Sequence, residues 1–120
     1  MADAEDSAVR HAEQLIDAMQ NLRHSLEQRE NSLRQAMEAR RSGADFASAL
    51  YAAQIAEERV DLNDALLVLE QCRRETRIAG FKAALDHGLS INELSRIWGF
   101  SRQMASRYAK EARGEAPEQS

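Results

Sequence analysis

The side chains best suited to chemistry are concentrated between residues 96 and 113, and most of them are cationic, amide or hydroxyl groups. Arg102 or Arg107 could donate two parallel hydrogen bonds to a guanine base, and Gln103 could form a matching pair with adenine. The serines and the other cations suit phosphate or solvent. The candidate DNA-contacting residues are Arg96, Ser101, Arg102, Gln103, Ser106, Arg107, Lys110 and Arg113.

Two short helices joined by a tight turn would position these side chains. Ser90 and Glu93 form a capping-box pair, in which each side chain can bond the backbone N–H of the other, and this predicts a helix that ends near Trp98. Residues 99–101 are glycine, phenylalanine and serine. They predict a turn in which the glycine takes a left-handed φ, the phenylalanine fills the core and the serine caps the next helix. That helix is expected over residues 102–113.

The segment 90–108 resembles the helix-turn-helix of bacterial repressors and of resolvase and invertase DNA-binding domains. The positions that carry the resemblance are Leu94, Ser95, Trp98, Gly99, Phe100, Ala105 and Tyr108. Alanine is more usual at Ser95 and leucine at Trp98, and neither departure puts the fold in doubt. The resemblance implies that the second helix enters the major groove with its N-terminal half toward the base edges. A pair of helices that only pack together is the alternative.

A further helix is expected at residues 74–87, with its apolar side chains on one face. Gly80 within it costs roughly 1 kcal/mol against alanine, so it marks either a break or a close packing contact. With the two short helices it completes an expected helix-turn-helix domain at residues 74–114. Four cations in or beside this helix could contact phosphate or could equally be solvated or form salt bridges: Arg73, Arg74, Arg77 and Lys82.

The first 73 residues are expected to form an antiparallel helical hairpin of the coiled-coil type. Mostly apolar residues step by three and four along residues 7–41, which predicts a helix with a heptad seam that Arg29 and Arg40 interrupt. That seam runs through Ala12, Leu15, Met19, Leu22, Leu26, Arg29, Leu33, Ala36 and Arg40. Residues 42–45 interrupt the pattern, and a second long helix is expected over residues 45–74. The sequence leaves open whether this helix continues into the one at 74–87.

Both hairpin helices carry more apolar positions than a single seam uses. In the second helix, one stripe contains Val60 and Leu67, and an adjacent stripe contains Leu50, Ile55 and Leu66. This surplus predicts a second buried surface, most simply against the same hairpin of another copy. A homodimer through residues 8–72 is therefore expected, with packing of the second helix on the C-terminal domain as the alternative.

The net charge of −4 hides a strong segregation of charge. Residues 1–72 carry seven arginines against fourteen acids, a balance of −7, whereas residues 73–113 carry nine lysines or arginines against four acids, a balance of +5. Residues 114–120 add −2, and segment 115–120 is expected to be a disordered tail. A basic segment beside an acidic one is typical of nucleic-acid contact by the basic part, although simple solvation of helix faces would give the same count.

Several classes of protein are disfavoured by the composition. Cys72 is the only cysteine, and no secretory apolar segment begins the chain, which points to the cytoplasm. No apolar stretch approaches the ~20 residues that span a bilayer. His11, His24 and His87 lack metal-ligand spacing, so no metal, no other cofactor and no catalytic residue is expected. An enzyme is not expected.

The sequence therefore predicts an all-α protein that binds double-stranded DNA and associates with the nucleoid. The first hypothesis is a sequence-specific transcriptional regulator that acts as a coiled-coil homodimer. The alternative is an architectural or adaptor protein in DNA partition, recombination or chromosome organisation, with a hairpin that recruits a protein partner.

Overall fold

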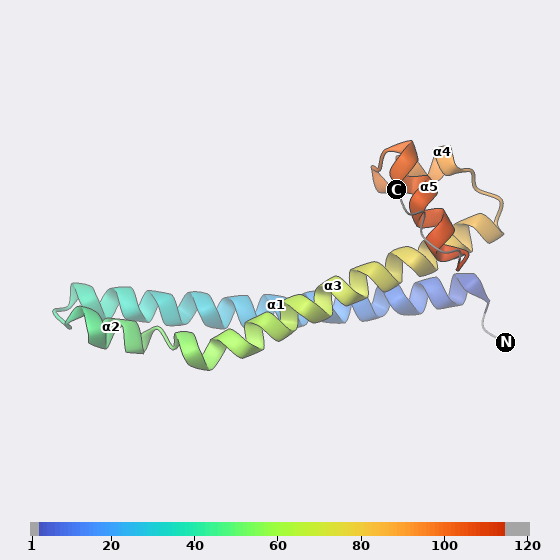
Figure 1. Cartoon of the computed structure of the whole chain (residues 1–120). Helices are drawn as coiled ribbons and strands as arrows, with labels where there is room; N and C mark the ends of the chain where they lie inside the picture. Colours follow the sequence, from blue (N-terminus) through green and yellow to red (C-terminus); the bar gives the residue numbers. More distant parts are fainter. Residues whose placement is uncertain (1–2, 115–120) are drawn as a thin grey trace. The chain divides into compact units, whose positions relative to one another are not determined.

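A computed structural model describes residues 3–114, and the regular secondary structure of this part of the chain is helical, without a strand. The helices are α1 (Ala4–Arg41), α2 (Phe46–Ala52), α3 (Ile55–Asp86), α4 (Ile91–Trp98) and α5 (Arg102–Ala112) (Figure 1). The all-α prediction is confirmed. The predicted disordered tail, 115–120, lies outside the described residues. None of the described helices is both long enough and apolar enough to cross a membrane.

The chain divides into two compact units. The central unit comprises residues 16–71, and the terminal unit comprises the described residues of segments 1–15 and 72–120. α3 is a single helix from Ile55 to Asp86, which answers the question that the sequence left open at residue 74. The predicted boundary between residues 73 and 74 thus falls inside a helix. The start of α1 belongs with the C-terminal helices rather than with the central unit.

The central unit buries small side chains. Within residues 16–71, all of which the structure describes, the buried residues are Ala18, Ser32, Ala36, Ala49, Ala53 and Ala65. Met19, Leu26 and Leu33 were expected in the seam of α1, but each remains 44–45% exposed. Ala18 and Ser32, each one residue before a predicted seam position, are buried instead. Alanine and serine let helix backbones approach closely, so the fully buried positions of this unit are small side chains, while Leu22, Leu62 and Leu69 are only partly buried.

One continuous helix was predicted over residues 45–74, and this prediction is wrong. The structure breaks the helix near Ala53, where a cluster of polar side chains lies. The helix stops at Ala52 and restarts at Ile55, and Gln54 has a left-handed φ of 50°. Arg29 of α1 donates to the Ala53 carbonyl oxygen at 2.7 Å and to Glu58 at 2.8 Å. This bond gives the Ala53 carbonyl a partner outside the helix and so stabilises the break.

The terminal unit has a larger apolar core. Phe81 of α3 and Leu94 of α4 are completely buried, together with Ala105 and Ala109 of α5. The partly buried residues packed around them are Ala84, Leu85, Ile91, Trp98, Phe100, Tyr108 and Ala112. Complete burial of a side chain such as Phe81 contributes about 1.5–3 kcal/mol. The predicted inward positions of this segment are confirmed, and Ala109 joins them although the sequence analysis did not name it.

Gly80 allows Trp98 to pack directly on α3. A Cβ atom at position 80 would lie 3.0 Å from Cζ2 of the indole, closer than normal packing permits. The Trp98 ring also contacts Phe81, with the ring centroids 4.7 Å apart. Of the two explanations that the sequence allowed for Gly80, close packing is confirmed, because α3 runs through this residue without a break.

The start of α1 is held to the terminal unit by polar contacts. The Thr76 hydroxyl donates to the His11 carbonyl oxygen at 3.0 Å, and His87 Nε2 lies 3.1 Å from a Glu5 carboxylate oxygen. His87 follows the last residue of α3, near the carbonyls of the helix end. These contacts explain why residues 3–15 group with the C-terminal helices.

Candidate nucleic-acid interface

α4 begins at the capping box that its sequence predicts. The Glu93 backbone N–H donates to the Ser90 hydroxyl at 3.2 Å, and the Ser90 backbone N–H donates to the Glu93 carboxylate at 3.2 Å. Two of the N–H groups that a helix start leaves unpaired are thereby satisfied. The first helix of the candidate site is fixed by these local bonds and by the burial of Leu94.

The turn between α4 and α5 also follows the sequence prediction. Gly99 has a φ of +72°, in the left-handed region that side-chain-bearing residues avoid. The Phe100 backbone N–H donates to the Ser95 carbonyl oxygen at 3.0 Å, which closes the end of α4. The Ser101 hydroxyl accepts from the Met104 backbone N–H at 3.1 Å and caps α5. The direction in which α5 leaves the turn is therefore set by backbone geometry.

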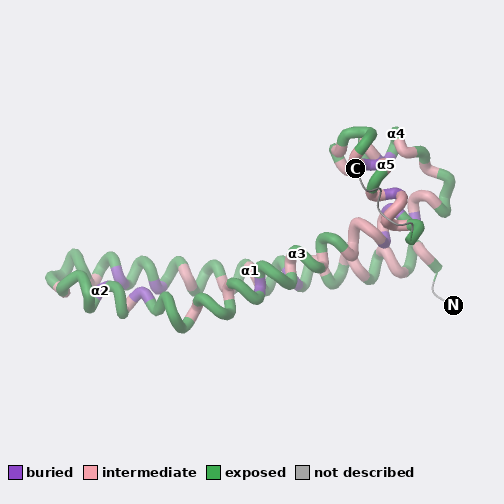
Figure 2. Tube along the Cα trace, in the orientation of Figure 1, coloured by how far each residue is buried: buried purple, intermediate pink, exposed green. Residues whose placement is uncertain are grey.

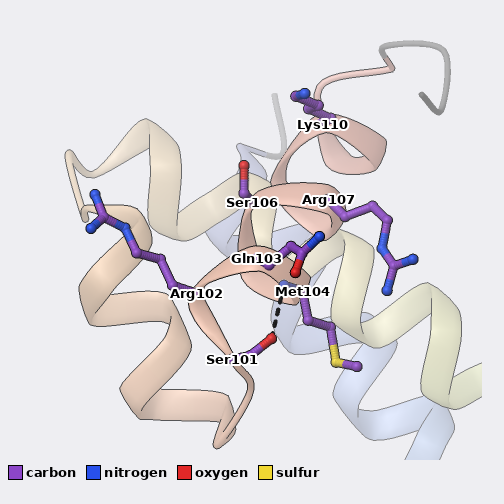
Figure 3. A pocket seen from close by; sticks show the side chains of 7 residues that line it. All are labelled: Ser101, Arg102, Gln103, Met104, Ser106, Arg107 and Lys110. Atoms are coloured by element: carbon purple, nitrogen blue, oxygen red, sulfur yellow. Dashed lines mark hydrogen bonds between the residues drawn. The ribbon is translucent and has the colours of Figure 1, made fainter. Parts of the chain in front are cut away.

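The outer surface of α5 gathers most of the predicted DNA-contacting residues. The residues around one open surface depression are Ser101, Arg102, Gln103, Met104, Ser106, Arg107 and Lys110. Figure 3 shows Arg102 and Arg107 extending in different directions from the helix, and Gln103 lies between them. Six of the eight predicted site residues share this surface. Arg96 of α4 and Arg113 after α5 are exposed but do not line it.

The charge of this depression is positive. Its lining includes Arg102, Arg107 and Lys110, and no carboxylate is among its seven residues. The acid nearest in sequence, Glu111, lies 3.3 Å from Arg77 and 3.7 Å from Arg74, both on α3. Glu111 therefore lowers the positive charge beside α3 rather than in the depression, and the depression remains suited to an anion.

Arg77 contacts α5 in a way that its sequence context does not predict. It was left open between phosphate contact and salt bridging, and its guanidinium carbon lies 3.9 Å from the centre of the Tyr108 ring. Its Nη2 also pairs with Glu111, while its Nε is buried without a hydrogen-bond partner among the described residues. Arg77 thus positions α5 on α3 through an aromatic ring and a carboxylate of that helix. No local pattern in the sequence predicts this long-range contact.

The part of the chain that the structure describes contains no group of three or more histidine, cysteine, aspartate or glutamate side chains suited to a metal ion. Comparisons with protein-family models, with curated proteins and with solved structures found no significant match to this chain. Interpretation of the site therefore rests on its own residues and geometry.

Proposed function

We propose that this chain is a sequence-specific DNA-binding protein that reads double-stranded DNA with α5 and regulates transcription. The observation that carries the proposal is the depression on the outer side of α5, which is lined by Arg102, Arg107 and Lys110 without a carboxylate and is backed by a packed core. Six residues chosen from the sequence for their hydrogen-bonding chemistry line that one surface. Nucleic-acid contact by a helix requires such a one-sided distribution, with cations for phosphate and planar donors for bases.

In this proposal α4, the turn and α5 act as a helix-turn-helix. The N-terminal half of α5 enters the major groove, where Arg102 or Arg107 contacts guanine and Gln103 contacts adenine. Ser101 uses its oxygen to cap α5 and can still donate its proton to a phosphate. The other phosphate contacts come from Ser106 and from the three remaining cations, Arg96, Lys110 and Arg113.

A single helix-turn-helix contacts few base pairs, so specific binding usually needs two. We propose that residues 8–72, as an antiparallel helical hairpin, pair two copies of the chain. A two-fold dimer would bind an inverted repeat whose half-sites are about 34 Å apart, or a multiple of this distance. The protein would then act on the nucleoid in the cytoplasm.

Selection of bound sequences from a random pool of duplex DNA tests this function. We expect enrichment of an inverted repeat, and binding that weakens steeply as salt rises. Arg102→Ala should relax the preference at one base position by about 1–3 kcal/mol, whereas Arg113→Ala should weaken all sequences alike. Arg23→Ala, an exposed position in the central unit, is the matched control and should leave DNA binding unchanged. Weak, salt-insensitive binding without enrichment would refute the proposal.

A second candidate function is supported by the exposed apolar residues of the central unit. Thirteen large apolar side chains of residues 16–71 are at least 44% exposed, and an exposed apolar surface of this extent marks an interaction site. An architectural or adaptor protein in DNA partition, recombination or chromosome organisation would use this surface to recruit a protein partner. Occupancy at a few promoters in cells favours the regulator, and broad coating of DNA favours the adaptor.

A further inference from the structure

The central unit has an apolar groove near the turn between α1 and α2. Its larger lining side chains are Leu33 and Met37 of α1, Phe46 and Leu50 of α2, and Ile55 of α3. Alanines form the rest of the apolar lining, and the only other lining residues are Arg40 and Arg41. Every one of the five larger side chains is 45–68% exposed, so the groove is an open apolar surface rather than a filled core.

Two rows of apolar side chains extend this groove along the unit. Met19 and Leu26 precede Leu33 at intervals of seven residues, which keeps all three on one face of α1. On α3, Leu66 follows Ile55 by eleven residues, about three helical turns, and so shares its face. Because Leu33 and Ile55 both line the groove, the two rows border the same side of the central unit. Figure 2 shows how few buried positions occur along these helices.

We name this surface the groove face. It consists of Met19, Leu26, Leu33, Met37, Phe46, Leu50, Ile55 and Leu66. These eight side chains are 44–68% exposed, so together they leave an apolar area on the order of the ~800 Å² per partner that a stable protein–protein interface buries. A contiguous exposed apolar surface of this size marks an interaction site, whereas the apolar side chains scattered over an ordinary surface do not form rows of this length.

We propose that the groove face pairs with the groove face of a second copy of this chain, which gives a four-helix dimer core. This inference rests on the homodimer of the proposed function and specifies its interface. The seven-residue spacing of Met19, Leu26 and Leu33 is the pattern by which one helix packs against another. An isologous interface requires that a surface complement itself, and two copies of this face supply matching rows and sufficient area.

Large apolar residues on other sides of the helices are not part of this interface. Val60 and Leu67 of α3 are 61% and 69% exposed, and neither lines the groove. Val60 and Leu67 follow Ile55 by five and twelve residues. Neither separation is close to a whole number of turns at 3.6 residues per turn, so both side chains lie on another side of the helix. Leu67 therefore provides a matched control, because it has the same side chain as Leu26 and Leu33 and at least equal exposure.

The test measures molecular mass in solution for the full chain and for charged variants. We expect the wild type to have twice the chain mass of 13.5 kDa at micromolar concentration. Leu26→Glu combined with Leu33→Glu should weaken association at least 100-fold, with helix content by circular dichroism retained, because both side chains are already half exposed. Leu67→Glu should remain dimeric.

Three results would overturn the groove-face dimer. These are a monomeric wild type, a double variant that stays dimeric, and a Leu67→Glu variant that dissociates as readily as the double variant. If the double variant loses helix content, the combined Met37→Gln and Leu50→Gln variant makes the same test with uncharged side chains. If that variant remains a dimer, the groove-face dimer is again contradicted. A monomer purified with an unrelated protein seated on the groove face would also overturn it.

The same variants separate this inference from the DNA-binding proposal. A monomeric Leu26→Glu, Leu33→Glu variant should still prefer the selected half-site over random DNA, with lower affinity for the inverted repeat. If the wild type is a monomer that nevertheless selects a DNA sequence, the dimer interface is wrong and DNA recognition by α5 stands. If the wild type is a dimer without any DNA preference, the groove face stands and the proposed function fails.

Discussion

The two units of this chain use their apolar side chains in opposite ways. The terminal unit buries Phe81 and Leu94 completely and gathers three more aromatic rings around them. The central unit, residues 16–71, buries alanines and Ser32, while many of its large apolar side chains, such as Leu33, Met37 and Ile55, remain about half exposed. Since burial of apolar surface is the main favourable term in folding, the terminal unit is stabilised by its own core. The central unit presents apolar surface that a partner could bury.

The largest difference in stability between variants of the two units is expected when the buried Phe81 ring is removed from the terminal unit. Phe81→Ala should destabilise the protein by about 3–5 kcal/mol, because it removes the residue that contacts Trp98, Phe100 and Tyr108. Urea denaturation followed by Trp98 fluorescence measures this change. Val60→Ala, at a 61% exposed position of the central unit, should change stability by less than about 0.5 kcal/mol. If Phe81→Ala and Val60→Ala lower the free energy of unfolding by similar amounts, the difference in packing between the two units does not produce a difference in stability.

The polar cluster of the central unit should give the next largest effect. Arg29 and Glu58 form their ion pair with side chains only 16% and 19% exposed, so Arg29→Met leaves Glu58 partly buried without its cation. We expect a loss of about 2 kcal/mol, measured by urea denaturation with circular dichroism. The control is Arg34→Met, whose pair with Glu30 lies on the surface at 72% and 63% exposure and should contribute almost nothing. Equal effects would mean that the cluster does not stabilise the break at Ala53.

The smallest expected effect is a pH dependence at the start of α2. Hydrogen bonds from Ser48 hold the pKa of the Asp45 carboxyl below its ordinary value of 3.8. A lowered pKa in the folded state means that this cap contributes its full stability above about pH 4 and loses it as the pH falls through the folded-state pKa. Asp45→Asn keeps an acceptor but does not titrate. The difference in urea midpoint between the two proteins should therefore change between pH 7 and pH 3, and a constant difference would contradict the assignment.

Local sequence rules predicted the terminal helices well. The capping box at Ser90 and Glu93, the left-handed glycine at 99 and the serine cap at 101 each involve residues within four positions of one another. Their geometry follows from backbone hydrogen bonding that needs no distant partner. The outward residues of α5 could be predicted as well, because the positions of the inward residues on a helix determine which positions face outward.

Long-range contacts could not be predicted in the same way. The Ala53 carbonyl at the break accepts from Arg29, twenty-four residues earlier, and the packing of α5 on α3 includes the contact of Arg77 with Glu111, thirty-four residues later. Periodicity also placed Met19 and Leu33 in the seam of α1, whereas Ala18 and Ser32, one position earlier, are the residues that are buried. These small residues permit close approach, and a pattern read by hydrophobicity underrates them.

Some residues of α5 pack in the core and others are exposed. This difference has a consequence for how the binding preference of such a protein could change. Ala105 and Ala109 face the core and Ser101 caps the helix, whereas Arg102, Gln103 and Arg107 are exposed and make no contribution to that core. Exchanges at the three exposed positions should therefore leave the fold intact. If α5 reads DNA as proposed, new target preferences can arise by substitution there at little cost in stability, and duplicated copies of the gene could acquire separate sets of binding sites on an unchanged scaffold.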